Sequence, residues 1–376
     1  MKRAALAPAQ RTDWLRLART SGVGPVTFAG LMDRFDTPEA AIEALPRLAR
    51  RGGRVDPIRI VSRAAAEDEI AAVEAVGARL LCACEPDFPA LLAAIDPPPP
   101  VISARGALDA NAQPACALVG ARNASAVGLR FAGDLARGLG ARGVTVVSGL
   151  ARGVDGAAHA GALETGTIAV LAGGIDQIYP PEHAELHAAI GETGLLVSES
   201  PPGHVATARD FPRRNRLISG LSLGVVVVEA AERSGSLITA RLAAEQNREV
   251  MAVPGSPLDP RSKGTNRLLR DGAALIESVD DVLAILEQGP RPQAAEPPGD
   301  AYDAEPPEPN IDAEADDVRE RIVALLSPSP VSRDELARAA GASPRAVMAA
   351  LVELELAGRC EIQPGGMVRL AYPSGD

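Results

Sequence analysis

The sequence predicts an α/β protein whose largest domain is a doubly wound, mostly parallel sheet. Three observations indicate this class: short apolar runs alternate with helical stretches through the middle of the chain, glycine-rich loops follow the apolar runs, and hydrophobic residues make up 46% of the 376 residues. Parallel strands need helical crossovers that cover both faces of the sheet, which produces this alternation. Such sheets bind ligands in the loops beyond the carboxyl ends of their strands.

The strands and helices of the middle of the chain follow from its apolar pattern. Short runs rich in Val, Ile and Leu are typical of strands buried on both faces, and longer amphipathic runs are typical of helices. We expect strands at 116–119, 144–148, 168–171, 195–198, 223–228 and 250–253, and helices that include 127–139, 154–163 and 237–246.

The first hundred residues have a different, helical and short-looped pattern. Trp14, Leu15 and Leu17 begin a series of apolar residues at helical spacing, which the turn Gly22-Val23-Gly24 interrupts. A turn of this kind binds phosphate in helix-hairpin-helix modules, but it also simply reverses a chain, and the second interpretation is preferred here. Four consecutive prolines at 97–100 mark a stiff boundary. We expect a SAM-like or helix-hairpin-helix-like domain at 1–100 and the sheet domain at 101–289.

An acidic, proline-rich segment follows the sheet domain. Residues 290–317 hold seven prolines and nine acidic residues against one arginine, which is a charge of −8 out of the net −11. The remaining charge of −3 leaves room for basic clusters elsewhere, so the acidity does not exclude an anionic partner. Such a segment cannot bury enough apolar surface to order itself, and we expect an extended linker.

The last predicted domain, 318–376, has the pattern of a winged helix. A helix is expected at 318–326, Ser332 and Glu335 form a capping box for a second helix, and Ser343-Pro344 begin a third that ends near Ala357. A hairpin at 360–363 and 367–371 completes three helices and a wing.

Cysteine spacing and the distribution of apolar residues indicate the cellular compartment. Cys82, Cys84, Cys116 and Cys360 form no C-x-x-C pair and no zinc-type spacing, so we expect reduced thiols and no metal. Residues 1–10 lack the apolar core of a signal peptide, and no apolar run approaches the ~18 residues of a membrane span. A soluble cytoplasmic protein without membrane contact is expected.

Arginine clusters stand beside three predicted strands. Arg122 follows Gly120-Ala121, where small residues let a strand turn into a helix whose free N–H groups attract an anion. One arginine alone is most simply a solvated side chain, but parallel topology brings these clusters to one edge, where several guanidinium groups suit several phosphates. The predicted phosphate-binding residues are Gly120, Ala121, Arg122, Gly149, Arg152, Arg213, Arg214, Asn215 and Arg216.

Glycine turns add backbone donors to the same edge. Backbone nests of this kind cradle phosphate, but they also occur as plain strand-to-helix loops. Phe211 stands beside the arginines in a chain with only 2% aromatic residues, where it serves either to stack on a base or to fill the core. The predicted site therefore also includes Gly173, Gly174, Phe211, Ser234, Gly235 and Lys263.

Patterns that suggest an enzyme are weaker. Asp155 and His159 lie four residues apart on one helix face and suit acid–base work, but no nucleophile is tied to them and a structural, buried histidine is the commoner arrangement. The stretch 220–224 matches a nucleophile elbow by letter, yet a helix precedes it and a strand follows, the reverse of an elbow. Phosphate-loop and dinucleotide fingerprints are absent. We expect no catalytic residue and no cofactor.

Taken together, the motifs resemble those of the DprA/Smf (DNA-processing protein A) family. Arg122 matches the arginine of the family's G-S-R loop, with Ala121 in place of the serine, and Arg214-Asn215-Arg216 match its R-N-R segment. Lys263 lies in the family's S-x-G-x-N loop. The segments that carry the resemblance are 119–122, 148–155 with His159, 173–180, 211–220, 234–240 and 253–255.

The resemblance implies an extended Rossmann-like central domain that binds single-stranded DNA without sequence preference. It also implies a cytoplasmic, non-catalytic homodimer, formed through that domain, which helps to load the RecA recombinase during natural transformation. The competing class is a nucleotide or nucleoside-phosphate hydrolase on a lysine-decarboxylase-like Rossmann fold, although the G-G-x-G-T-x-x-E motif of those enzymes is missing. A winged-helix transcription regulator is the third hypothesis. Glu353 and Glu355 in the third helix of the tail suit a DNA groove poorly, so protein contact or weak duplex binding is expected there.

Overall fold

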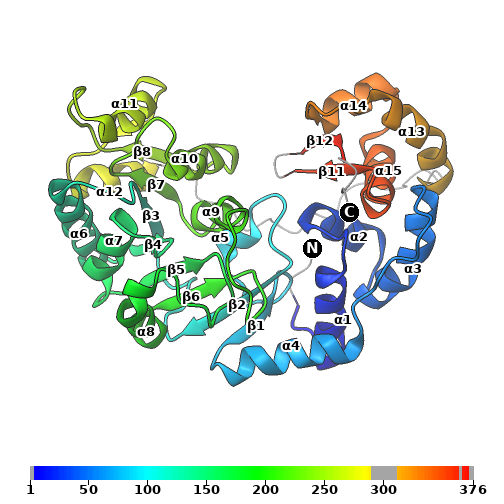
Figure 1. The fold of residues 1–376 in the computed structure, drawn as a ribbon, viewed down its shortest axis with the longest axis horizontal. Helices are drawn as coiled ribbons and strands as arrows, with labels where there is room; N and C mark the ends of the chain where they lie inside the picture. Colours follow the sequence, from blue (N-terminus) through cyan, green and yellow to red (C-terminus); the bar gives the residue numbers. More distant parts are fainter. Residues whose placement is uncertain (1–3, 289–310, 364–365, 372–376) are drawn as a thin grey trace.

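The computed structural model describes residues 4–288, 311–363 and 366–371. They form two lobes (Figure 1): a central α/β lobe, and a second lobe in which the N-terminal helices lie beside the C-terminal winged helix although almost the whole chain separates them. Within these residues, no helix combines the length and apolar character of a membrane span. Most of the predicted linker, up to residue 310, lies outside the described residues.

Four helices make up the N-terminal module: α1 (Pro8–Arg19), α2 (Pro25–Arg34), α3 (Pro38–Arg51) and α4 (Arg63–Ala75). Prolines stand in the first turns of α1, α2 and α3, where a missing N–H costs nothing. The rings of Trp14 on α1 and Phe28 on α2 pack with their centroids 4.8 Å apart. Gly22 takes a φ of +85°, as the turn between α1 and α2 requires.

The central lobe holds a nine-stranded sheet in the order β1-β2-β6-β5-β4-β3-β7-β8-β9. The strands from β3 onward pair in parallel, whereas β1 and β2 pair with each other, and β2 with β6, in the antiparallel sense. The six predicted strands are confirmed. They are β3 (Ala115–Val119), β4 (Thr145–Ser148), β5 (Thr167–Leu171), β6 (Leu195–Ser198), β7 (Gly224–Val227) and β8 (Glu249–Ala252).

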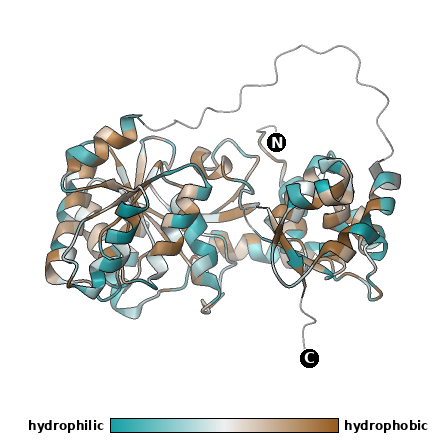
Figure 2. Cartoon of the chain, turned by 90° about the horizontal axis from the view of Figure 1, so that it is seen from above, coloured by the Kyte–Doolittle hydropathy of each residue, from teal (hydrophilic) through white to brown (hydrophobic). Residues whose placement is uncertain are grey.

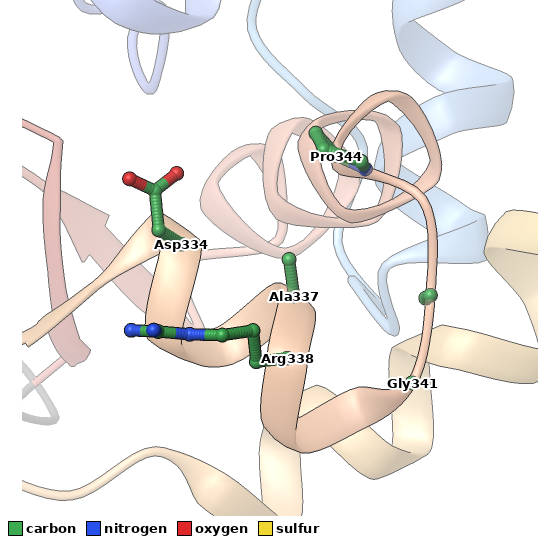
Figure 3. A pocket seen from close by; sticks show the side chains of 6 residues that line it. Asp334, Ala337, Arg338, Gly341 and Pro344 are labelled. Carbon is green, nitrogen blue, oxygen red and sulfur yellow. The ribbon is translucent and has the colours of Figure 1, made fainter.

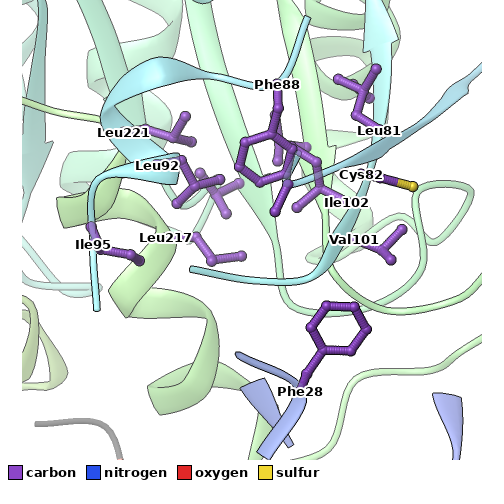
Figure 4. Close-up of a cluster of buried hydrophobic side chains, with 14 of the residues drawn as sticks. Phe28, Leu81, Cys82, Phe88, Leu92, Ile95, Val101, Ile102, Leu217 and Leu221 are labelled. Carbon is purple, nitrogen blue, oxygen red and sulfur yellow. The ribbon is translucent and has the colours of Figure 1, made fainter. Parts of the chain in front are cut away.

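Three further strands are β1 (Arg79–Cys82), β2 (Val101–Gly106) and β9 (Ala274–Leu275), with the short helix α5 (Ala90–Ala93) between the first two. Although β1 falls inside the predicted N-terminal domain of 1–100, it pairs with β2 and so belongs to the central sheet. The four prolines that look like a boundary lie within the connection that leads into β2. Figure 4 shows Leu81 of β1, Leu92 of α5 and Leu217 of α9 (Asp210–Gly220) in one cluster of buried hydrophobic side chains.

Helices cover both faces of the sheet, as a doubly wound fold requires. One face packs on α6 (Ala126–Ala141), α7 (Val154–Ala162) and α12 (Val279–Gln288), and the other on α9 (Asp210–Gly220) and α10 (Gly235–Glu245). Side chains alternate between the faces of the sheet. Leu118 therefore packs in the core under α6, α7 and α12, and Val119 packs in the core under α9 and α10. The helices α8 (Ala184–Thr193) and α11 (Lys263–Arg270) complete the lobe. Figure 2 shows the hydrophobic residues between the layers and the hydrophilic residues on the outer helix faces.

The C-terminal module is a winged helix, as predicted. It consists of α13 (Ile311–Leu325), β10 (Val331–Ser332), α14 (Arg333–Ala340), α15 (Pro344–Leu356), β11 (Cys360–Ile362) and β12 (Met367–Leu370). The hydroxyl of Ser332 accepts from the backbone N–H of Glu335 at 3.2 Å, and that of Ser343 from Ala346 at 3.2 Å. Both serines therefore cap their helices as predicted, which for Ser332 is the serine half of the predicted capping box. Helix α13 begins at Ile311, inside the predicted linker.

Candidate nucleic-acid interface

The topology of the sheet places the predicted loops at one edge. Strand β3 pairs with β4 on one side and with β7 on the other, so the order of the strands reverses at β3. Loops that leave two strands in opposite directions open a crevice at their carboxyl ends. The loops after β3, β4, β5, β7 and β8 carry most of the predicted site, and α9 begins at the same edge because it follows β6.

Small residues let the loops after β3 and β4 touch. The backbone N–H of Val154 donates to the carbonyl oxygen of Ala121 at 3.3 Å. Gly153, with a φ of +79°, lies so close to the carbonyls of Ala121 and Arg122 that a Cβ would overlap them. A Cβ on Gly120 would come within 2.6 Å of the Val154 side chain. These glycines therefore join the two loops and place the Arg122 backbone on the edge.

The beginning of α6 already holds an anion from the protein itself. The carboxylate of Glu229, from the loop after β7, accepts from the Ser125 backbone N–H at 2.8 Å and from the Ser125 hydroxyl at 2.5 Å. The Ser125 hydroxyl in turn accepts from the N–H of Gly128 at 2.9 Å. Two of these helix-start N–H groups are therefore occupied: that of Ser125 bonds to a carboxylate 104 residues away in the chain, and that of Gly128 bonds to the Ser125 hydroxyl.

Arg122 and two aromatic rings form the exposed part of the edge. The guanidinium carbon of Arg122 lies 5.2 Å from the centroid of the Phe211 ring, a cation–π distance. Phe211 in turn packs on Tyr179, with ring centroids 5.4 Å apart at an interplanar angle of 56°. Tyr179 is half exposed and Arg122 is exposed, while Phe211 is partly covered. One surface thus holds a cation, Arg122 from the loop after β3, and two rings, Tyr179 from the loop after β5 and Phe211 from the start of α9.

Arg214 points inward from the same helix. Only 6% of it is exposed, and its Nη1 donates to the carbonyl oxygen of Gly149 at 2.6 Å and also to that of Val170. Burial lowers the pKa of Arg214 to about 10, against the opposing effect of the nearby Asp155 carboxylate, so the group stays charged at neutral pH. Asp155 accepts from the N–H groups of Gly149 at 3.1 Å and Ala151 at 3.4 Å. Arg214 therefore links the loop after β4 to the end of strand β5.

The neighbours of Arg214 on α9 have separate environments, because successive residues of a helix point about 100° apart. Arg216 is buried and donates to Glu199 at 2.5 Å. The exposed side chain of Arg213 lies 3.5 Å from the same carboxylate. Asn215 donates to the carbonyl oxygen of Gly235 at 3.4 Å, which links α9 to the start of α10.

The remaining predicted residues are spread along the edge. Arg152 is exposed and pairs with Glu182, and Lys263 is exposed on the first residue of α11. Ser234 caps α10 by accepting from the N–H of Ser236 at 3.4 Å. The N–H of Gly174 donates to His204 at 2.9 Å, and Gly173 packs against the same His204 carbonyl, so this turn binds its own neighbouring loop.

His159 is fully used by the fold. Its Nε2 accepts from the N–H of Leu150 at 3.3 Å, and its Nδ1 lies 2.8 Å from the hydroxyl of Thr167. Burial lowers the pKa of His159 to about 3, so the ring is neutral. Burial raises the pKa of Asp155 above its ordinary value, and the carboxylate bonds to backbone N–H groups instead of to the histidine. This pair holds the turn after β4 in place.

Two hollows differ in what surrounds them. A cavity of about 70 Å³ lies at the arginine edge between Gly149, Gly173, Tyr179, Phe211 and Arg214. A shallow depression of about 570 Å³ lies on the winged helix at the turn from α14 to α15 (Figure 3), where Asp334 and Arg338 are its only charged lining side chains. Only the first brings cationic and aromatic groups together. Across residues 4–288, 311–363 and 366–371, no group of three or more His, Cys, Asp or Glu side chains is arranged to hold a metal ion.

Sequence reasoning did not include Tyr179 or Glu229 in the site. Tyr179 carried a signal, since it is one of three tyrosines and lies in a loop after a predicted strand. Glu229 carried none, because its contact with Ser125 depends on how β3 and β7 pair.

The fold and this edge define a Rossmann-like protein with a cationic and aromatic edge on its central sheet, flanked by a helical module and a winged helix. Residues 79–287 match the family model of DNA recombination-mediator protein A. Residues 8–72 match the DprA-like N-terminal HHH domain, and residues 305–366 match the DprA winged helix domain. The chain belongs to the DprA/Smf family.

Relatives of known name agree with this assignment. Protein Smf of Escherichia coli is 43% identical over 290 residues, which are 75% of this chain and 74% of that protein. Protein Smf of Synechocystis is 30% identical over 96% of this chain and 98% of its own. The X-ray structure of DNA processing protein A from Streptococcus pneumoniae superimposes with a TM-score of 0.64 at 32% identity, covering 76% of this chain and 98% of that one. DNA processing protein A from Helicobacter pylori gives a TM-score of 0.51 at 29% identity over 55% of this chain and 94% of its own.

Proposed function

We propose that this protein binds single-stranded DNA at the carboxyl edge of its central sheet and acts as a recombination mediator in natural transformation. The structure of the Helicobacter pylori relative describes a single-stranded DNA binding mode of that protein. The observation that carries the proposal for this chain is Arg122 lying over Phe211, with Tyr179 beside it. A cation for phosphate beside rings for bases is the combination that binds single strands without reading their sequence.

The structure suggests a division of work among the arginines. Arg122, Arg152 and Arg213 are exposed, as is Lys263, so these four side chains can reach the phosphates of a strand that lies along the edge. Arg214 and Arg216 are buried and donate to carbonyl and carboxylate oxygens. They therefore fix the positions of the loops, and their positive charge lies beneath the surface of the edge. Phe211 and Tyr179 provide the surface for stacking.

A binding role fits the interior of the site better than hydrolysis does. An acid–base catalyst needs a group that reaches the ligand and titrates near the working pH. His159 is completely buried, neutral and bonded on both ring nitrogens, and Asp155 bonds to the backbone. We therefore propose that the protein has no catalytic activity of its own, and that a hydrolase of the lysine-decarboxylase-like class is the less favoured function.

The finer parts of the proposal rest on family membership alone. They are the delivery of the bound strand to a RecA-type recombinase, the formation of a homodimer through the central domain, and a cytoplasmic location.

The proposal is tested by fluorescence anisotropy with a labelled oligothymidine and a hairpin duplex of equal length. We expect preference for the single strand and a loss of roughly tenfold in affinity with Arg122→Ala, the effect of about 1.4 kcal/mol. Arg130→Ala is the matched control, because Arg130 is an exposed arginine of α6 that lies 3.7 Å from Asp134. Equal affinity of wild type and Arg122→Ala, or preference for the duplex, would refute the proposed interface.

A further inference from the structure

Helix α15 of the winged helix is covered on two sides. It is the third helix of the module, the one that enters the major groove when such modules read DNA. In Figure 1 it lies against α2 and α3 of the N-terminal module as well as against its own domain. From 351 to 356, every residue is buried except Glu355, which is partly exposed. This half of α15 therefore has no face open to DNA, and exposure is confined to its first turns, where Pro344 and Arg345 are exposed.

The two modules share their hydrophobic cores. Val352 and Leu356 of α15 belong to the core cluster that also holds Trp14 and Phe28, whereas Val26 of α2 belongs to the core of the winged helix. Gly30 of α2 makes room for the crossing, because a Cβ there would lie 2.9 Å from Cγ2 of Val352. The contact is therefore an interlocked packing of side chains.

Glu353 gives the contact an ionic centre. Its side chain is fully buried, and Arg319 of its own module donates to it at 3.0 and 2.5 Å. Arg51 and Arg34 of the N-terminal module reach the other carboxylate oxygen, at 3.3 and 3.6 Å. A buried carboxylate is costly unless cations surround it, and two of these three cations come from the partner module.

Polar contacts at the end of α15 make the fit specific. The hydroxyl of Thr27 donates to the Glu355 carboxyl group, and Nη1 of Arg54 donates to the carbonyl oxygen of Leu356 at 2.9 Å. Gly52, at the end of α3, lies against the Glu353 carbonyl with no space for a Cβ. The acidic residues that suit DNA poorly thus have protein partners.

The turn between α1 and α2 is covered by the same contact. A Cβ on Gly22 would lie 3.8 Å from the carbonyl oxygen of Glu355 and 3.9 Å from Cα of Leu356. The G-x-G turn and the third helix of a winged helix are the two elements of this chain that resemble duplex-binding elements, and they lie against each other.

We propose that α15 is a docking helix for the N-terminal module of the same chain, and that the winged helix serves as a protein-binding module in place of a duplex reader. Its partner surface is the face of α2 and α3 that carries Gly30, Arg34 and Arg51. This inference does not depend on the proposed binding of single strands.

A disulfide across the contact tests the docking in the full-length protein. Cβ of one cysteine and Sγ of the other lie about 3 Å apart in a disulfide. The corresponding distance from a Cβ on Gly30 to Cγ2 of Val352 is 2.9 Å. We expect Gly30→Cys combined with Val352→Cys to form an intramolecular bond under mild oxidation. Cys82, Cys84, Cys116 and Cys360 are buried and free, so they should not compete.

The matched control combines Gly30→Cys with Arg345→Cys. Arg345 lies on α15 two turns before Val352, about 10 Å along the helix, and should not cross-link. Non-reducing electrophoresis and intact mass separate a bond within one chain from a bond between two chains. Failure of the first pair to cross-link, equal cross-linking of the control pair, or a bond formed only between chains would overturn the proposal.

DNA binding by the cross-linked protein gives the second readout. If α15 is a docking helix, the oxidised protein should bind single strands and duplex with affinities unchanged within about twofold from the reduced protein. A duplex affinity that is present after reduction and lost on oxidation would show that α15 reads DNA when released, which contradicts the proposal.

Discussion

The guanidinium group of Arg214 occupies the space that a side chain on Gly149 would need. Its Nη1 donates to the Gly149 carbonyl oxygen at 2.6 Å, and a Cβ at position 149 would lie 2.8 Å from the guanidinium carbon and from both Nη atoms. The two residues are 65 positions apart in the chain, yet the position of Arg214 leaves no room for a side chain at position 149.

Gly149→Ala should displace Arg214 and break its link between the loop after β4 and the end of β5, which continues into the loop that follows. Overpacking of this kind costs about 1–3 kcal/mol, which denaturant unfolding would measure. Because the edge of the site moves with these loops, affinity for single strands should fall as well. Gly133→Ala on α6 is the control, since its Cβ would meet only an ordinary contact of 3.5 Å. Equal stability of the two variants would show that the Arg214 side chain has room to move.

Phe211→Ala should weaken single-strand binding by removing a stacking surface. A base stacked on an aromatic side chain contributes about 1–3 kcal/mol, so we expect a loss of roughly 5- to 150-fold. Phe211→Leu preserves most of the apolar volume but no ring, and should lose nearly as much if stacking is the cause. If Phe211→Leu binds like wild type, Phe211 fills space and does not stack.

Salt should weaken the binding of single strands in proportion to the phosphates contacted. With about four phosphates neutralised, at ~0.7 released ions each, log K should fall against log salt with a slope near −3. Arg122→Ala should reduce the steepness by ~0.7, whereas Phe211→Ala should leave the slope unchanged because a ring releases no counterions. A titration of wild type with no salt dependence would contradict phosphate binding.

The buried Glu355 carboxyl group, at the contact between α15 and the N-terminal module, should make the folded protein more stable as pH falls from about 7. Burial raises the pKa of Glu355 from 4.5 to about 7, with a smaller contribution from Glu361 and an opposing one from the Ile362 N–H. Between these values the folded protein holds a proton that the unfolded chain has lost. The stability is therefore present in full below about 4.5 and is lost as pH rises to about 7, up to a limit on the order of 3 kcal/mol.

Thermal unfolding and hydrogen exchange of α2 at pH 5.5 and 8 would measure this effect. Glu355→Gln, which keeps the shape and cannot ionise, should abolish the difference between the two pH values in this contact. Glu320→Gln is the control, because Glu320 is largely exposed on α13. A pH response that is the same in Glu355→Gln and wild type would assign the effect to another group.

The sequence was sufficient to predict the parallel part of the sheet, because strands buried on both faces leave continuous apolar runs. It was insufficient for β1 and β2, since their pairing is antiparallel and a run of prolines between them looks like a domain boundary. The arginine loops could be assigned to one edge from topology alone. The exposure of each arginine could not be predicted, because it depends on the orientation of α9 and on partners such as Glu199 and Gly149, which lie 17 and 65 residues away in the chain.

Interlocked cores have a practical consequence for shortened versions of this protein. The N-terminal module and the winged helix bury parts of each other's surface. Deleting the winged helix alone would therefore expose Val26, Gly30 and Arg51 to solvent. Such a fragment should aggregate because of this exposed apolar surface, for reasons unrelated to DNA binding. A truncation just before Arg79, where β1 starts, would in turn expose the part of the central lobe that the N-terminal module covers, where Trp14 Nε1 donates to the carbonyl oxygen of Pro100 at 2.9 Å.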